Sequence, residues 1–305
     1  MIQLGILDFG RRGDSNSLDI IEQIITYASK AEEYGFNRFW LGEHHLPIPN
    51  VSYTNPEIII SIIAGMTENI LVGSAGSLIS MHSPYTLASN FRLLNNIYYK
   101  RIELGLAKGA PESVKVMELT NDKLLSTPQH EIFDEKLNDI VTLLNNDEYN
   151  LHENKIVITP YGGENPGIWY LSSDFNYLEL AIEKDLNYCV STFHGPRKKL
   201  SATKDKLKEF RTAFYEKNRR DVKIVLSIAF CSDEGKIQED QNPTVHQNES
   251  FNILHVTVEK LSQIIQEYHD EYGIDEFVLY DTSATNEAKI LNLKKLNTIY
   301  YADEK

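Results

Sequence analysis

The sequence lacks several features that define whole classes of protein. Its apolar runs fall short of the ~20 residues that a membrane-spanning helix needs, so we expect no membrane span. It has only two cysteines, Cys189 and Cys231, and they are not spaced as metal ligands. Both lie in apolar, strand-like runs, so we expect reduced core thiols in a cytoplasmic protein. The opening MIQLGILDFGRR has no basic leader ahead of an apolar stretch, so we expect no secretion signal.

Basic residues are also scarce. The 305 residues include 30 Lys and Arg against 44 Asp and Glu, a formal net charge of −14. An acidic chain repels phosphate backbones and anionic lipid, which argues against nucleic acid and membrane partners. An anionic cofactor would need a local positive or amide-rich site. The hydrophobic fraction of 42% is enough to form a sizeable core.

Short apolar runs alternate with helical patterns along the chain. The predicted strands are Gln3–Phe9, Asn37–Leu41, Ile70–Ser77, Arg101–Ala107, Ile168–Leu171, Tyr188–Thr192, Val222–Ala229 and Glu276–Tyr280. The predicted helices are Leu18–Tyr34, Pro56–Thr67, Pro84–Tyr98, Glu131–Asn145, Phe175–Lys184, Lys198–Lys217, Val258–Tyr272 and Glu287–Ile299.

Eight strands, each followed by a helix, predict an α/β protein that closes into a (β/α)8 TIM barrel. A doubly wound sheet competes, but Gly10-Arg11-Arg12-Gly13 does not supply its glycine-rich turn. No linker interrupts the chain, so we expect a single domain over residues 1–305. An excursion from Lys108 to Pro166 follows the fourth strand and carries a small predicted strand, Ile156–Ile158. A polar loop after the seventh strand, Ser232–Ser250, is expected to be mobile.

Polar and small residues gather where the predicted strands end, which is where such barrels place their chemistry. Glu43-His44-His45 ends the second strand, and its imidazoles beside a carboxylate suit acid/base chemistry near neutral pH. The same residues could be metal ligands, or could only brace the loop that follows. Ser172-Ser173-Asp174 either caps the next helix or holds a phosphate, for which Lys108 offers a matching charge.

Several of these segments resemble one protein family. RFWLGEHH (Arg38–His45), the stretch Asn69–Ile97 and RIELGLAKG (Arg101–Gly109) resemble the second, third and fourth strands of the bacterial luciferase-like flavin monooxygenases. LGILDFG (Leu4–Gly10), IWYLSSDFNYLELA (Ile168–Ala181) and DEFVLYD (Asp275–Asp281) look like three further strands of that family.

The resemblance implies a two-component monooxygenase that binds FMN at the barrel rim. Reduced FMN would come from a separate flavin reductase, and with O2 it would oxygenate a small organic substrate. His44 matches the catalytic histidine, with Glu43 and His45 beside it. The implied cofactor-binding residues are Asp8, the Ala75-Gly76 pair with its cis peptide, Lys108 where an arginine usually meets the phosphate, and the turn residues Ser172, Ser173, Asn176 and Tyr177.

Some departures from the family pattern keep alternatives open. Lys100-Arg101 replaces the family's Gly-Arg, and Lys108 keeps a charge but loses the bidentate arginine fork. The alternatives are a deazaflavin-dependent oxidoreductase, a non-catalytic flavoprotein or partner subunit of the same fold, and a metal-dependent hydrolase that uses His44 and His45.

Two of the predicted helices, Pro56–Thr67 and Pro84–Tyr98, are apolar on more than one face. Ile58, Ile59, Ile60, Ile62 and Ile63 cannot all point into one core at helical spacing. An exposed apolar face of that size usually marks an interface. Family members pair through helices in this part of the barrel, so we expect a homodimer, or a heterodimer with a related chain.

Overall fold

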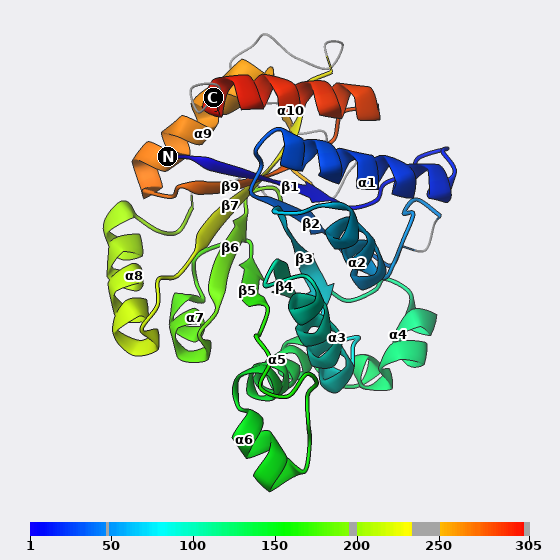
Figure 1. The fold of residues 1–305 in the computed structure, drawn as a ribbon, viewed down its shortest axis with the longest axis vertical. Coiled ribbons are helices and arrows are strands. Elements are labelled where there is room, and N and C mark those ends of the chain that lie inside the picture. Colours follow the sequence, from blue (N-terminus) through cyan, green and yellow to red (C-terminus); the bar gives the residue numbers. More distant parts are fainter. Residues whose placement is uncertain (47–48, 195–199, 234–250, 302–305) are drawn as a thin grey trace. The chain divides into compact units, whose positions relative to one another are not determined.

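The computed structural model describes residues 1–46, 49–194, 200–233 and 251–301 (Figure 1). The strands are β1 (Gln3–Asp8), β2 (Arg38–Leu41), β3 (Leu71–Leu78), β4 (Ile102–Ala107), β5 (Gly167–Ser172), β6 (Asn187–Ser191), β7 (Ile224–Cys231), β8 (Leu254–His255) and β9 (Glu276–Asp281). The helices are α1 (Ser17–Glu33), α2 (Pro56–Met66), α3 (Pro84–Ile97), α4 (Val114–Thr120), α5 (Gln129–Asn145), α6 (Asp147–Tyr149), α7 (Leu178–Lys184), α8 (Lys204–Asn218), α9 (Val258–Tyr272) and α10 (Asn286–Tyr300), with short η1 (Asp122–Leu125) and η2 (Asn150–Asn154) turns.

The strands form one sheet in the order β6-β5-β4-β3-β2-β1-β9-β7-β8, and a further β6–β7 pairing closes it. The registered pairs β1–β9, β3–β4, β6–β7 and β7–β9 are all parallel. A closed parallel sheet alternating with helices is a (β/α)8 barrel, so the predicted fold class is confirmed. Among the described residues, no helix is long and apolar enough to cross a membrane.

The chain divides into two compact units. Unit 1 comprises Met1–Asp8, Thr26–Phe39 and Tyr170–Lys305, and unit 2 comprises Phe9–Ile25 and Trp40–Trp169. The single domain over 1–305 stays a prediction.

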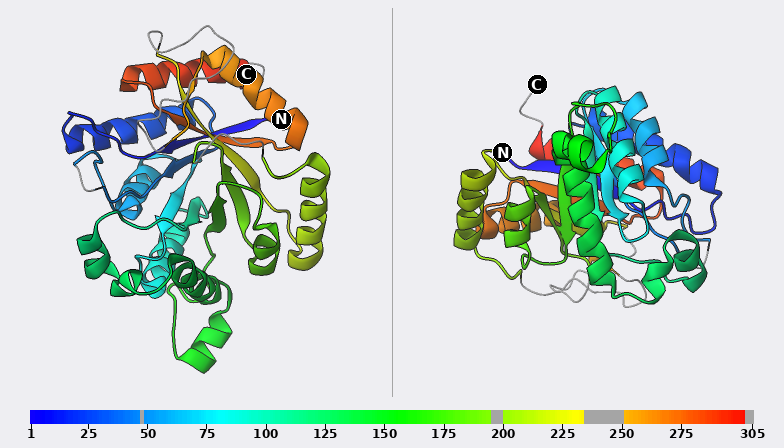
Figure 2. Two further views of the ribbon diagram at one scale, coloured as in Figure 1. Left: turned by 180° about the vertical axis from the view of Figure 1, so that it is seen from behind. Right: turned by 90° about the horizontal axis from the view of Figure 1, so that it is seen from below.

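In unit 1, β7 is buried along its whole length and pairs with β6, β8 and β9. Helices α9 and α10 of this unit lie side by side (Figures 1 and 2). Both cysteines are buried in this unit, as predicted for core thiols.

In unit 2, α3 packs against both β4 and α5, so the excursion after β4 is held to the body of the unit (Figure 1). Arg92 of α3 is buried and makes several hydrogen bonds to the excursion. Its guanidinium donates to Asp147 Oδ1 at 2.6 Å, to Asn165 Oδ1 at 2.7 Å and to the Ile158 carbonyl at 3.3 Å, and it also donates to the Leu144 carbonyl.

Several helix ends lie at proline, serine and glycine residues that favour such ends. Pro56 and Pro84 open α2 and α3, and Ser83 caps α3 by accepting a hydrogen bond from the Thr86 amide. Gly35 follows α1 with a φ of +82°, the left-handed conformation that glycine adopts at low cost. Each of these boundaries was predicted from the sequence.

Three sequence predictions need correction. Ile156–Ile158 is not a strand, because the Ile156 amide bonds to the Asn150 carbonyl and the Ile158 carbonyl accepts from Arg92. Helix α7 begins at Leu178 rather than Phe175, since residues 174–177 form a turn. The excursion contains α4, η1, α6 and η2 besides the predicted helix. Most of the loop predicted to be mobile, 234–250, lies outside the described residues.

Candidate functional site

The central feature of unit 2 is the carboxylate of Glu43, which is buried at the end of β2. One oxygen lies 2.8 Å from His45 Nε2, and both oxygens lie 2.9 Å from His82 Nε2. The Leu78 amide donates to the same carboxylate at 2.9 Å. Three donors thus converge on one buried anion, from the segment after β2, from the last residue of β3 and from the loop after β3.

These contacts decide the protonation of the cluster. Burial by itself would raise the pKa of Glu43, but hydrogen bonds from His45, His82 and the Leu78 amide, with the charge of His82, lower it to about 2. Burial would lower the pKa of His82, but the carboxylates of Glu43 and Glu57 outweigh it and raise that pKa. The geometry therefore favours an ionised Glu43 paired with a protonated His82.

Lys136 of α5 fixes the loop that carries His82. Its ammonium donates to the Ser80 carbonyl at 2.9 Å and to the His82 carbonyl at 2.6 Å. The Asn121 side chain donates to the Ser80 carbonyl as well, at 2.8 Å. The excursion after β4 is therefore bonded to the loop after β3, and it sets the position of the imidazole that Glu43 binds.

His44, the predicted catalytic histidine, is half-buried and stacks on Phe9, with ring centroids 4.5 Å apart and an interplanar angle of 22°. Gly42 makes this stack possible. A Cβ at Gly42 would lie 2.1 Å from Phe9 Cδ1, far inside van der Waals contact. Because Gly42 has no side chain, the Phe9 ring can pack against the His44 ring.

The small-residue segment of β3 has the implied backbone form. The Ala75–Gly76 peptide is cis, and the β3–β4 register shifts between Ser74 and Ser77. Ser77 Oγ donates to Ser74 Oγ at 3.0 Å. The cis peptide is confirmed, while the role of Ala75 and Gly76 in binding a cofactor stays a prediction.

Lys108 follows β4 and is half-buried. Its ammonium lies 5.1 Å from the centre of the Phe133 ring, and its carbonyl accepts from Gln129. A cation held over an aromatic face is oriented and partly desolvated. Lys108 belongs to unit 2, whereas the predicted turn residues Ser172 and Ser173 belong to unit 1.

In unit 1, Asp8 is buried and lies 3.2 Å from the ammonium of Lys289. Burial alone would lower the pKa of Lys289, but Asp8 and Asp281 raise it. Asp281 in turn accepts hydrogen bonds from Asn292 Nδ2 at 2.7 Å and from the Ser283 amide at 2.9 Å. Asp8 is thus part of a buried ion network where β1 and β9 end, and its role in cofactor binding stays a prediction.

In the turn after β5, which was predicted to hold a phosphate, a carboxylate already accepts hydrogen bonds, and phosphate binding there stays a prediction. Ser172, Asn176 and Tyr177 lie in it as expected, and Ser173 is exposed beside them. The carboxylate of Asp174, however, accepts hydrogen bonds from the Asn176 amide at 2.9 Å and from Asn176 Nδ2 at 2.6 Å. An acidic side chain therefore occupies the backbone and side-chain donors of Asn176.

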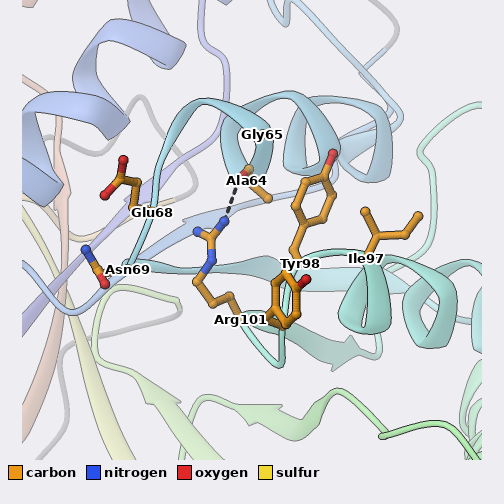
Figure 3. Close-up of a pocket in the computed structure, with 8 residues that line it drawn as sticks. Ala64, Gly65, Glu68, Asn69, Ile97, Tyr98 and Arg101 are labelled. Carbon is orange, nitrogen blue, oxygen red and sulfur yellow. Dashed lines mark hydrogen bonds between the residues drawn. The ribbon is translucent and has the colours of Figure 1, made fainter.

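A pocket of about 500 Å³ lies elsewhere in unit 2, at the amino ends of β3 and β4 (Figure 3). Arg101 lines this pocket, and its guanidinium donates to the Ala64 carbonyl at 2.5 Å and to the Thr67 carbonyl at 3.0 Å. Arg101 therefore caps the end of α2. Lys100, which stands where the family has glycine, has a φ of +65°. The pocket is therefore remote along the strands from the predicted chemistry.

Two residues of the Glu43 cluster, His82 and Lys136, were not predicted as site residues. They lie 39 and 93 positions after Glu43, and no local motif joins them to it. The available signal was physical, because a buried carboxylate needs cationic or amide partners. No group of three His, Cys, Asp or Glu residues arranged to hold a metal ion occurs within the described parts of the chain.

Comparison with known proteins places the chain in a family. The family model described as luciferase-like monooxygenase matches residues 2–252. The Bacillus subtilis (strain 168) protein YceB is 29% identical over 77% of this chain and 70% of its own length. The N-acetyl-S-alkylcysteine monooxygenase of the same organism is 28% identical over 70% of this chain but only 62% of its own length.

Solved structures show the same fold at low identity. Apo-MsnO8 has a TM-score of 0.76 at 18% identity and covers 98% of both chains. The FMN complex of the oxygenating constituent of 3,6-diketocamphane monooxygenase from Pseudomonas putida scores 0.66 at 16% identity, covering 98% of this chain and 97% of that one. An F420-dependent secondary alcohol dehydrogenase scores 0.69 at 13% identity, covering 96% and 97%. These likenesses show the fold alone, and it is the family match over residues 2–252 that shows that the chain belongs to the luciferase-like monooxygenase family.

Proposed function

We propose that this protein is a two-component, flavin-dependent monooxygenase that uses reduced flavin and O2 to oxygenate a small organic substrate. FMN is the flavin that the resemblance implies. The observation that carries the proposal is the buried Glu43 carboxylate, which binds His45 and His82 directly beside His44. Imidazoles with a fixed charge partner are suited to holding and moving protons near neutral pH.

Each residue of the cluster has a distinct part in this proposal. Reduced flavin, when bound, supplies the electrons that activate oxygen. His44 is the catalytic residue that exchanges a proton with the reacting molecules. Glu43 fixes the tautomer and direction of His45, because an ionised carboxylate accepts only from a protonated ring nitrogen. His82 and Lys136 are positioning residues that hold Glu43 and its loop in place.

A deazaflavin-dependent oxidoreductase is the second candidate. It is favoured by the likeness in fold to the F420-dependent secondary alcohol dehydrogenase. Such an enzyme transfers a hydride and consumes no oxygen. A non-catalytic flavoprotein or partner subunit would bind flavin without turnover.

The expected partners, assembly and location of the protein are proposals of the same kind. A separate reductase is the expected partner, since the proposal needs flavin that arrives already reduced. A homodimer is expected from the apolar helices α2 and α3. Location in the cytoplasm is expected from the two reduced thiols.

The test supplies reduced FMN from an unrelated flavin reductase under isotope-labelled O2. Substrates would begin with N-acetyl-S-alkylcysteine thioethers, the class named for one Bacillus subtilis relative, and would include simple ketones. Labelled oxygen in a product supports the proposal. Hydride transfer to or from a deazaflavin without oxygen uptake would instead establish the second candidate. The His44→Ala variant serves as the matched control for oxygenation that does not depend on the site.

A further inference from the structure

The backbone amides of the turn between β5 and α7 are already hydrogen-bonded to other groups of the chain. The four consecutive amides of residues 174–177 donate to side-chain oxygens of Ser172, Ser201, Asp174 and Tyr188, at 3.3, 3.2, 2.9 and 3.3 Å. Consecutive amides in a turn are the usual cradle of a phosphate. In this turn the cradle is already filled.

Asp174 is the one charged acceptor among the four, and it brings a negative charge to the turn. One carboxylate oxygen accepts from the Asn176 amide at 2.9 Å and from Ser172 Oγ at 3.4 Å, and the other accepts from Asn176 Nδ2 at 2.6 Å. These donors are neutral, so they leave the charge of Asp174 in place. A phosphate brought to this turn would meet a like charge and would have to displace it.

The turn is also anchored, which makes such a displacement costly. Tyr188 of β6 accepts from the Tyr177 amide and donates to the Asp174 carbonyl at 2.9 Å. Phe175 is buried and stacks on the Tyr188 ring, with centroids 5.9 Å apart. Helix α7 has only seven residues after the turn, so it adds little dipole to attract an anion.

We propose that Asp174 is a specificity-determining residue that discriminates against a phosphate at this turn. A flavin whose ribityl chain ends in an uncharged hydroxyl, the riboflavin class, then binds at least as tightly as FMN. This inference rests on the proposed function, since it assumes that the protein binds a flavin. It departs from the sequence prediction that Ser172, Ser173 and Asn176 hold the phosphate of FMN.

The experiment measures equilibrium binding of riboflavin and FMN to the full-length protein by flavin fluorescence. Three variants are compared with the wild type: Asp174→Asn, which removes the charge and keeps an acceptor; Asp174→Ser, which serves if the amide disturbs the turn; and Glu179→Gln. The last is the matched control, because Glu179 is an exposed acid in the first turn of α7 that is not bonded to the turn amides.

The deciding quantity is the ratio of FMN affinity to riboflavin affinity. We expect this ratio to be near or below one in the wild type, and to rise about tenfold in Asp174→Asn through tighter FMN binding alone, with Glu179→Gln unchanged. A rise of less than about threefold in both Asp174 variants would overturn the inference and leave the proposed function standing. Binding of neither flavin by any form would overturn the proposed function, and the inference with it.

Discussion

At the scale of single residues, Glu43 makes the stability of the protein depend on pH in a defined direction. Its folded pKa of about 2 lies below the ordinary carboxyl value of 4.5. A carboxylate with a lowered pKa contributes stability that is present above its unfolded value and is lost as pH falls through the folded value. The contribution of Glu43 should therefore disappear between these two values.

We expect Glu43→Gln to lower the free energy of unfolding at pH 7 by about 3 kcal/mol, the equivalent of the pKa difference in a fully buried group. The deficit relative to the wild type should shrink as pH falls from 4.5 toward 2. Chemical denaturation across that range measures it. Glu57→Gln is the matched control, because burial raises the pKa of Glu57 and its substitution should change stability with the opposite sign. A deficit that is constant with pH would contradict this assignment.

His44 carries the second prediction at this scale. His44→Ala should leave flavin binding nearly intact and cut oxygenation by about 100-fold, the usual effect of losing a general acid or base. Its ring contacts Phe9 in a stack, so its removal leaves the Glu43 cluster in place. Single-turnover product formation and flavin titration measure the two effects. His152→Ala, at an exposed histidine of η2, should alter neither. Equal turnover in His44→Ala would make His44 a structural residue only.

At the scale of elements, one buried arginine joins α3 to the excursion. Arg92 is buried and donates to four groups of the segment 144–165, whereas Lys100, just beyond α3, reaches Glu164 of the same segment while both side chains are exposed. Removing one partner of a buried ion pair leaves uncompensated polar groups, but an exposed pair is worth little.

We therefore expect Arg92→Met to destabilise the fold by about 3–5 kcal/mol, and Lys100→Met by less than about 1 kcal/mol. Amide hydrogen exchange should rise first in α6 and η2, because Asp147 loses its partner there. Denaturation midpoints and peptide-resolved exchange measure both effects. Similar losses in the two variants would show that the excursion is held by its apolar contacts and not by Arg92.

The elements also show how far sequence patterns reach. Alternation of apolar runs and helices predicted the barrel and placed eight strands, because barrel strands are buried on both sides and read as short apolar runs. The excursion could not be predicted in the same way. Ile158 of the apolar run Ile156–Ile158 is buried, as a strand residue would be. Its carbonyl, however, accepts a hydrogen bond from Arg92 rather than from a neighbouring strand.

Of the candidate Glu43 cluster, the sequence pointed only to the residues that are close together along the chain. Glu43, His44 and His45 form one motif at a strand end, and the cis Ala75–Gly76 peptide followed from family resemblance. His82 and Lys136 come from distant segments, and only folding brings them together. The carboxylate of Asp174 competes with a phosphate for the donors of its turn, which depends on side-chain direction and not on residue order.

At the scale of the whole molecule, the two apolar helices of unit 2 separate into buried and exposed faces. Ile59, Ile60 and Ile63 of α2 are buried, while Ile58, Ile62 and Met66 are 59%, 38% and 63% exposed at intervals of four residues. Leu93 and Ile97 of the neighbouring α3 are exposed as well. The surplus of apolar residues noted in the sequence therefore lies on one outward stripe of each helix, as an interface would require.

The last prediction follows from these two faces. If the exposed stripe pairs two copies of the chain, Ile62→Asp should convert a dimer into a species near the 34.9 kDa chain mass. This monomer should stay folded, because Ile62 lies on the exposed face of α2. Ile63→Asp, one residue along the same helix, should instead unfold the protein, because a buried charge without a partner costs several kcal/mol, about the whole margin of a marginal fold. Sedimentation velocity at micromolar protein, with circular dichroism for folding, distinguishes the two.

Because Ile62 and Ile63 receive the same substitution at adjacent positions, any general effect of added charge appears in both. A wild type that sediments as one species near the chain mass at every concentration would remove the interface, and the stripe on α2 and α3 would then need another occupant.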